Sequence, residues 1–160
     1  MNGRAMLCGA VALTTVGILA VTGCGTMRSG SMSKDEAIAQ RQQLMKRQGA
    51  AFGSINRKLK AGEVPAVASD AEVLMETSKQ IASLFPAGST SPTTSRAKPE
   101  IWQRWAQFEG YTKTLNAEAT KLRDAARAND ASATQAAFGA VNKNACTACH
   151  DAFRGPEIKK

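Results

Sequence analysis

Apolar side chains recur every three or four positions along most of this chain, which is the spacing of helices that bury one face. The first stretch with this spacing predicts a helix from Lys34 to Lys60. Ser33 followed by Glu36 forms a capping-box pattern at its start. Gly62 and Pro65 lie just beyond its end, where both residues break helices. The pattern therefore predicts a long first helix with defined ends.

A second helix is expected before a loop that is rich in Pro, Gly, Ser and Thr. Ser69 and Glu72 repeat the capping pattern, so we expect this helix to begin at Ser69. Its apolar face continues as far as Leu84, and Pro86 is expected to end it. Residues 86–98 then have the composition of a loop.

Two more amphipathic stretches complete the chain. Pro99 is suited to a first helical turn, and the spacing predicts a third helix from there to about Arg127. A fourth helix is expected from about Ser132 to Gly155. No window alternates with the period of two that a strand requires. Residues 34–160 are therefore predicted to form an all-α domain, an antiparallel up-down-up-down four-helix bundle.

Residues 1–23 have the pattern of an export signal, with Arg4 as the only charge before a long apolar stretch. The segment ends in a run that resembles the processing box of bacterial lipoproteins, Leu19-Ala20-Val21-Thr22-Gly23-Cys24. This pattern predicts removal of Cys8 with the signal, a lipidated Cys24, and a small, polar tether at 24–33. A single transmembrane anchor and an ordinary soluble signal are the alternatives.

The composition narrows the class of protein. Hydrophobic side chains make up 43% and charged ones 21% of the 160 residues, which supports one domain with a packed core. Aromatic residues make up only 5%, which favours an alanine-rich helical protein over a β-sandwich. The net charge of +8 suits an acidic partner or a membrane surface. The basic residues of the chain are dispersed along the sequence, and the chain is expected to be exported, so nucleic-acid binding is disfavoured.

The last predicted helix carries the run Cys146-Thr147-Ala148-Cys149-His150, the attachment motif of c-type haem. Two thiols form thioethers with the two vinyl groups of haem, and the adjacent histidine ligates the iron. On a helix, Cys146 lies three residues before Cys149 and four before His150, so all three project from nearly one face. His150 is the only histidine of the chain, so it is the only imidazole available to iron.

Three other uses of this cysteine pair fit the sequence less well. A thioredoxin-like pair lies at a helix N-terminus within a βαβ pattern, whereas this pair lies near the end of a helix and no strands are predicted. A disulfide between Cys146 and Cys149 is awkward on a regular helix. A zinc site lacks further ligands once Cys8 and Cys24 are assigned to export.

The position of this motif near the C-terminus of a four-helix chain resembles the cytochrome c′ family, the class II c-type cytochromes. The similarity covers nearly all of residues 35–154. Its most specific parts are the CxxCH motif and a block that runs from a proline to a tryptophan. The matching segments are Arg41-Gln42 with Met45, Leu84-Phe85-Pro86, Lys98-Pro99-Glu100-Ile101-Trp102, Ala136-Ala137-Phe138-Gly139 and Cys146 to Arg154.

The resemblance implies a covalent haem c between the helices, with His150 as the proximal ligand of its iron. Met45 occupies the position that faces the distal side of the haem in this family. In low-spin members a methionine there ligates the iron, whereas in high-spin members the site is vacant. Leu44-Met45-Lys46 with a following Gly49 is similar to the low-spin members, so Met45 is the predicted distal ligand. As the alternative, Met45 fills the core.

The resemblance also implies roles for three residues around the haem. Arg41 is expected to pair with a haem propionate, and a solvated surface arginine is the alternative. Arg154 is expected beside His150, where it can also stabilise a helix C-terminus. Trp102 is expected to pack near the haem, although ordinary core packing describes it equally well.

Two functions follow from these expectations. The first is an exported electron carrier, with histidine and methionine ligands, that exchanges electrons with acidic redox proteins near a membrane. The alternative is a high-spin protein that binds NO or CO at an open distal face. An enzyme is not expected, since peroxidase chemistry needs a second histidine. The resemblance implies a periplasmic location in a Gram-negative bacterium, and because members are often dimeric, a homodimer is one expected assembly.

Overall fold

A computed structural model describes residues 32–158. Every regular element in this range is helical, and two segments of the chain that lie far apart form one isolated bridge, Ala97 with Arg154. The elements are α1 (Lys34–Ala61), η1 (Val64–Ala66), α2 (Val67–Ser78), η2 (Ala82–Leu84), α3 (Glu100–Gln103), α4 (Trp105–Arg127), α5 (Ala131–Ala140), η3 (Val141–Thr147) and α6 (Ala148–Phe153).

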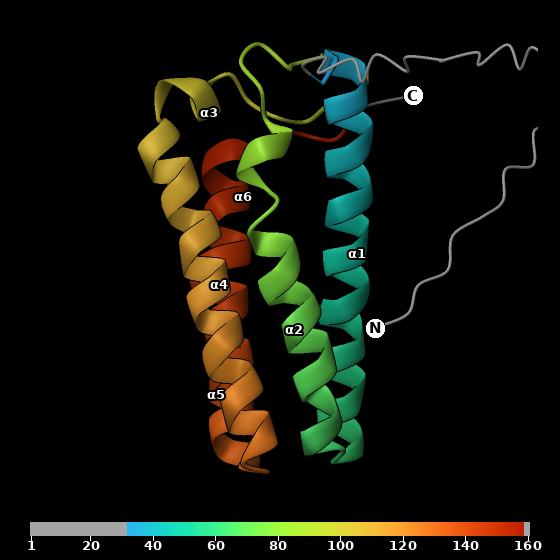
Figure 1. The fold of residues 1–160 in the computed structure, drawn as a ribbon, viewed down its shortest axis with the longest axis vertical. Helices are drawn as coiled ribbons and strands as arrows, with labels where there is room; N and C mark the ends of the chain where they lie inside the picture. Colours follow the sequence, from blue (N-terminus) through green and yellow to red (C-terminus); the bar gives the residue numbers. More distant parts are fainter. Residues whose placement is uncertain (1–31, 159–160) are drawn as a thin grey trace, which may run out of the picture. The chain divides into compact units, whose positions relative to one another are not determined.

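Four helical columns run alternately down and up, which confirms the predicted four-helix bundle (Figure 1). They are α1, α2, α4, and the continuous column of α5, η3 and α6. α2 packs against both α1 and α4, and α4 packs against α5 and η3, so α1 lies diagonally across from α4. The predicted signal, Cys24 and the tether at 24–33 lie outside the described residues, except for the last two residues of the tether.

The apolar faces of the columns meet in one core. Ile55 of α1, Leu74 of α2, Leu122 of α4 and Val141 of η3 are at most 1% exposed. The column of α1 meets that of α5 at an aromatic pair, because the rings of Phe52 and Phe138 lie 4.5 Å apart. Burial of these side chains from four columns supplies the main driving force for the fold.

The first helix begins and ends as the sequence predicts. The Ser33 hydroxyl accepts a hydrogen bond of 3.2 Å from the backbone N–H of Glu36, which is the N-cap contact. Glu36 does not complete the reciprocal capping box, since its carboxylate accepts from the Gln40 amide. At the other end, Gly62 has a φ of 74°, and its N–H bonds to the carbonyls of Leu59 and Lys58.

The predicted start of the second helix at Ser69 is wrong. Pro65 lies in the first positions of the short 3₁₀ turn η1, which leads directly into α2 at Val67, so the chain is already helical before Ser69. The Ser69 hydroxyl donates to the carbonyl of Ala66 at 3.1 Å and does not cap a helix. α2 also ends at Ser78, before the predicted end at Pro86, and only η2 continues the helical path.

The third and fourth predicted helices are both interrupted. Arg104, with φ of −119° and ψ of 43°, separates α3 from α4. The last column begins one position earlier than expected, because the Asp130 carboxylate accepts from the N–H of Ala133 at 2.9 Å and acts as the N-cap. Within this column η3 is a π-helix, an element with a wider turn that is rare and often found at functional sites.

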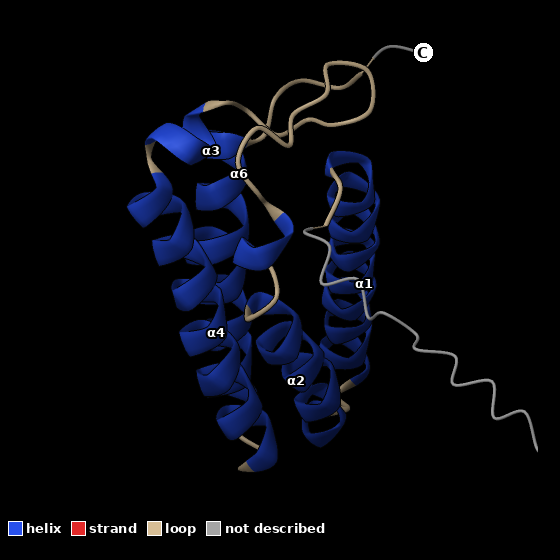
Figure 2. Ribbon diagram, turned by 45° about the horizontal axis from the view of Figure 1, so that its top comes forward, coloured by secondary structure: helices blue, strands red, loops and turns tan. Residues whose placement is uncertain are grey.

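The loop of residues 86–98 lies over the end of the bundle where α1 begins, and the C-terminal segment runs along it (Figure 2). The N–H of Gly155 donates to the carbonyl of Arg96 at 2.7 Å, and that of Lys98 to the carbonyl of Phe153 at 3.0 Å. These bonds close one end of the molecule. Among the described helices, none is long and apolar enough to cross a membrane.

Candidate functional site

A cavity of about 510 Å³ lies inside the closed end of the bundle. Its walls come from α1, α4, η3 and α6, together with parts of the loop at 94–97. Most of the lining is apolar and includes Phe85, Ile101, Phe108 and Leu115. This volume and this lining are typical of sites that enclose a small molecule or a cofactor.

The three residues of the CxxCH motif line this cavity together, as their spacing predicts. Cys146 is in the π-helix η3, whereas Cys149 and His150 are in α6, and all three are half-buried. Val141 and Ala145, on the neighbouring face of η3, are buried in the core. The last column therefore anchors its core face and turns the motif toward the cavity.

The surroundings of the two thiols keep them neutral. Burial raises the pKa of Cys146, and burial together with the neighbouring Cys146 raises the pKa of Cys149 to about 11. A redox-active pair of the thioredoxin type needs a thiol with a lowered pKa, whereas the surroundings of Cys146 and Cys149 raise the pKa of both thiols. Neither thiol forms a disulfide in the structure.

His150 lies among cations. Burial lowers the pKa of His150, and the guanidinium groups of Arg154 and Arg96 lower it further, while Asp151 opposes them. The imidazole is therefore held in its neutral form, the form that can coordinate a metal ion. Arg154 is exposed and lines the same cavity as His150.

Met45 lines the cavity from α1 and is half-buried, so the structure brings it into the same space as His150. Met75 of α2 is elsewhere, with its sulfur 3.6 Å from the guanidinium of Arg123. Met32 packs against the core, and Met27 lies outside the described residues. Among the described methionines, Met45 alone lines the cavity.

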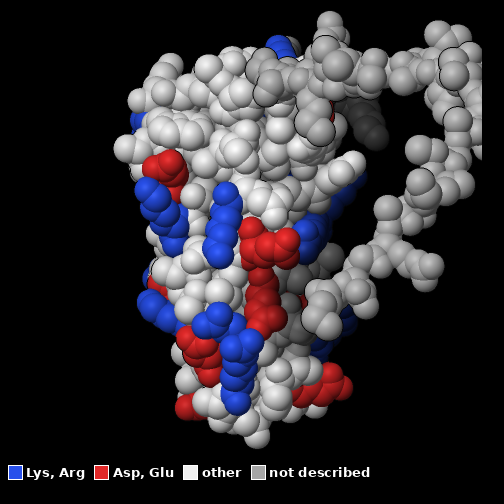
Figure 3. Space-filling view, in the orientation of Figure 1, with Lys and Arg blue, Asp and Glu red and all other residues white. Residues whose placement is uncertain are grey.

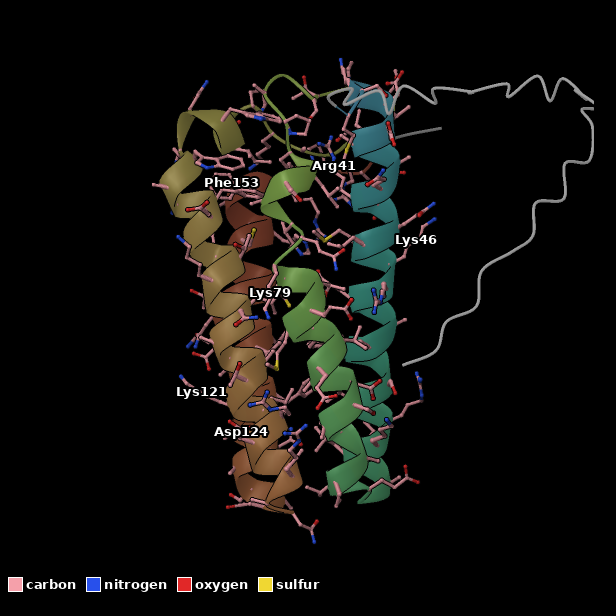
Figure 4. All side chains as sticks on the ribbon, in the orientation of Figure 1. Arg41, Lys46, Lys79, Lys121, Asp124 and Phe153 are labelled. Atoms are coloured by element: carbon pink, nitrogen blue, oxygen red, sulfur yellow. The ribbon has the colours of Figure 1, made fainter. Side chains whose placement is uncertain are left out.

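Arg41 is one turn before Met45 and is only 4% exposed. Its guanidinium donates to the Ser89 hydroxyl at 3.0 Å, to the Ser89 carbonyl at 2.6 Å and to the Ser95 hydroxyl at 2.6 Å, and it lies 4.6 Å from the ring of Phe85 (Figure 4). The alternative of a solvated surface arginine is therefore wrong. Within the described residues no carboxylate pairs with this buried cation, although it lines the cavity.

Sequence reasoning missed the partners of Arg41. Residues 86–98 were predicted only to be a loop, yet Ser89 is 1% exposed and Ser95 is half-buried against α1. The adjacent Gln42 amide also donates to the carbonyl of Thr94. The only signal in the sequence is the abundance of hydroxyl side chains in this loop, which also occurs in ordinary solvated loops.

An aromatic cluster borders one side of the cavity, and Trp102 belongs to its outer part. Phe108 packs against Phe85 with ring centroids 4.7 Å apart and against Phe153 at 5.6 Å. Trp102 does not line the cavity. Its indole N–H donates to the carbonyls of Phe85 and Pro86, both at 3.1 Å, and its ring lies 6.5 Å from that of Phe85. The predicted haem-packing residue thus contacts the cavity wall from outside.

The residues of this cavity fit a haem c. Two thiols and one neutral imidazole project from the last helical column, from η3 and α6, into an apolar space. The buried Arg41 lacks an anionic partner, which a propionate would supply. A metal ion held by side chains alone fits less well. Within residues 32–158 there is no group of three His, Cys, Asp or Glu side chains that could hold one.

Comparisons with known proteins agree with this chemistry. A family model described as cytochrome c′ matches residues 36–154. Cytochrome c′ from Rhodopseudomonas palustris is 32% identical over 146 residues, which cover 89% of this chain and 94% of that protein.

Solved structures with a similar fold include cytochrome c′ from Alcaligenes xylosoxidans. A ferrous variant with bound NO superposes with a TM-score of 0.69 and 28% identity, covering 78% of this chain and 98% of the solved one. A variant with bound carbon monoxide gives 0.70 and 28%, with 79% and 100% covered. A third structure, a cytochrome c′ with ligand-controlled dimer dissociation, gives 0.72 and 26%, with 79% and 100% covered.

Proposed function

This chain belongs to the cytochrome c′ family and carries haem c, and from that premise we propose that it binds CO or NO at the haem face opposite His150. The observation that carries this proposal is the composition of the cavity. His150 is the only histidine of the chain, so the wall formed by α1 offers iron no second imidazole. The NO and CO forms of the relative from Alcaligenes xylosoxidans support the same proposal.

The residues of the last column would hold the cofactor. Cys146 and Cys149 would each form a thioether, and His150 would ligate the iron from the same side. Bound haem supplies an iron that cycles between Fe(II) and Fe(III) and accepts axial ligands. Because most of the cavity lining is apolar, the walls would limit the access of water to a bound haem and would favour small uncharged ligands over ions.

Electron transfer with Met45 as the distal ligand is the second candidate function. It is favoured by one specific observation: Met45 lies on the cavity wall, and a thioether is a good ligand for haem iron. Histidine and methionine ligands retained in both oxidation states would suit an electron carrier. We place gas binding first because the solved relatives include forms with bound NO and with bound CO, which support gas binding at least as well as electron transfer.

Arg41 and Arg154 would act on the cofactor through charge. Arg41 would pair with a propionate at the closed end of the cavity, which is supported by its place on the cavity wall, while its other donors hold Ser89 and Ser95. Arg154 would lie beside His150 on the proximal side. Trp102 would support the wall through Phe85 and would not touch the haem directly. With no second imidazole, we infer that the protein does not act as an enzyme.

The proposal includes the expected cellular context. We infer export by the signal at 1–23, lipidation of Cys24 and attachment of the domain at 34–160 to a membrane in the periplasm through the tether at 24–33. Acidic redox proteins are the inferred partners. A homodimer is the inferred assembly, supported by the relative whose dimer dissociates under ligand control.

One visible spectrum tests the function. We expect the reduced protein to have a broad, high-spin spectrum and to shift its Soret band when CO is added. A sharp low-spin α band that CO leaves unchanged would reject gas binding in favour of the electron carrier. Covalent attachment is tested by denaturing the unmodified protein in acid. The haem should stay on the chain, because thioether bonds survive denaturation, and release of the haem would reject covalent attachment.

A further inference from the structure

Not every cation on the surface of this bundle is matched by an ion pair, and some of the unmatched cations lie at or near the cavity. Six of the seven ion pairs among the described residues involve α2 or α4. Figure 3 shows acids and bases side by side on this face. Among the pairs that join columns, Arg47 of α1 binds Glu76 of α2 at 2.9 Å, and Arg127 of α4 binds Glu72 of α2.

The two columns on either side of the CxxCH cavity have a different charge pattern. No Asp or Glu occurs in α1 after Glu36, and none occurs from residue 131 to residue 150 of the last column. Lys46 on α1 is exposed and lines the cavity, and Figure 4 shows it pointing away from the bundle. Lys143 on η3 is exposed and lies three residues before Cys146. Neither lysine forms an ion pair within the described residues.

Three other cations line the cavity, and the first of them, Arg41, is buried and bonded to Ser89 and Ser95. Arg96 also lines the cavity, but lies 3.9 Å from Glu157, an acid whose side chain is 91% exposed. Arg154, directly after α6, lines the cavity too, is exposed and forms no ion pair within the described residues. Lys46 and Lys143 are therefore exposed cations without an ion pair, as is Arg154, and the two lysines lie one on each of the columns that flank the cavity.

We propose that Lys46 and Lys143 form a docking site for an acidic electron-transfer protein. This inference rests on haem attachment as proposed above, and it applies to either candidate function, because CO binds only ferrous iron and the iron must therefore receive an electron. In each encounter one electron passes between the partner and the iron, and no proton or bond is exchanged. Cations beside the cofactor steer an anionic partner to the place where that electron can cross.

The test uses small anionic and cationic oxidants in place of the unidentified protein. Stopped-flow mixing follows oxidation of the ferrous holoprotein by hexacyanoferrate(III), which takes one electron from Fe(II) and becomes hexacyanoferrate(II). The variant is K46E/K143E, and the matched control is K113E/K121E, which changes the net charge equally on α4. Lys113 and Lys121 are 74% and 67% exposed. Lys121 points away from the bundle in Figure 4.

We expect K46E/K143E to react about tenfold more slowly than the unmodified protein at low ionic strength, and the control to slow by less than about threefold. The difference should nearly vanish at about 1 M salt, where the Debye length falls to about 3 Å. With the cationic oxidant tris(phenanthroline)cobalt(III), the order should reverse. K46R/K143R should keep the original rates with both oxidants.

Equal slowing in the two double variants would overturn the proposal, because net charge alone would then explain the rates. Unchanged rates in K46E/K143E would overturn it as well. Soret spectra and circular dichroism of each variant establish that the haem and the fold are intact. The CO spectrum decides between gas binding and electron carriage independently, so failure of the proposed function and failure of the docking site give different results.

Discussion

The guanidinium of Arg41 in α1 donates to the hydroxyl and to the carbonyl of Ser89, a loop residue 48 positions away in the sequence. Arg41 is 4% exposed and Ser89 is 1% exposed, so the pair joins α1 to the loop in the interior. A third bond, to Ser95, fixes a second point of the same loop. The residue that is expected to meet a haem propionate therefore also closes the end of the cavity.

Replacement of Arg41 by methionine should destabilise the protein. Hydrogen bonds from a charged donor contribute about 1.5–3 kcal/mol each, and relief of the buried charge offsets part of their loss, so we expect a net loss of about 2–4 kcal/mol. Urea unfolding of the holoprotein, followed by circular dichroism, measures this loss. Arg57→Met on the exposed side of α1 is the control and should cost less than about 0.5 kcal/mol. Equal stability of the two variants would contradict the role of Arg41 in holding the loop.

Met45→Ala separates the two candidate functions. If the distal position is open, as we propose, the spin state should not change and CO should bind about tenfold faster, because a half-buried side chain has been removed from the cavity wall. The measurement is the ferrous spectrum followed by flash photolysis of the CO form. Conversion from low spin to high spin would instead identify Met45 as the ligand. Met75→Ala, outside the cavity, should leave both properties unchanged.

The rings of Phe52 and Phe138 should be energetically coupled, because they join the column of α1 to that of α5 at a centroid distance of 4.5 Å. Phe138, which is 8% exposed, should cost about 3–5 kcal/mol when it is replaced by alanine. A double-mutant cycle with Phe52→Ala should give a coupling of about 0.5–1.5 kcal/mol. Additive losses would mean that the pair does not stabilise the contact between these columns.

The N-cap of the last column can be tested against the capping pattern that failed. Asp130→Ala should destabilise the protein by about 1 kcal/mol, because the N–H of Ala133 loses its acceptor. Ser69→Ala should change the free energy of unfolding by less than about 0.5 kcal/mol, since the Ser69 hydroxyl only donates to a carbonyl on an exposed turn. Thermal unfolding of both variants measures the difference, and a larger loss at Ser69 would show that it caps α2 in solution.

Several features of this protein could be predicted from the sequence because they depend on residues close together in the chain. The periodicity of apolar residues predicts four helical columns, and the N-cap Ser33 and the C-terminal Gly62 define the ends of α1. The short spacing of Cys146, Cys149 and His150 along one continuous helical column, η3 followed by α6, brings all three to the same cavity. These are consequences of helix geometry and of local hydrogen bonds, which short segments determine on their own.

Local signals were insufficient where a neighbouring segment competes with them. The capping pattern at Ser69 is overridden because Pro65 already lies in the turn that leads into α2. The period of apolar residues continues through Arg104, so it does not predict the break between α3 and α4. The apolar period also does not predict the π-helix η3. The wider turn changes which side chains of the column face the core, and this is evident only from the packing of Val141, Ala145 and Phe153 in one core.

The sequence by itself determined the helical class, the attachment motif and the single imidazole available to iron. Only the tertiary structure decided what surrounds that motif: the bonds of Arg41 to Ser89 and Ser95, the place of Trp102 behind Phe85, and the presence of Met45 on the cavity wall. Helix formation and cofactor attachment depend on spacing along a short stretch of chain. The shape and charge of the cavity depend on contacts between segments tens of residues apart, and those contacts exist only once the bundle has packed.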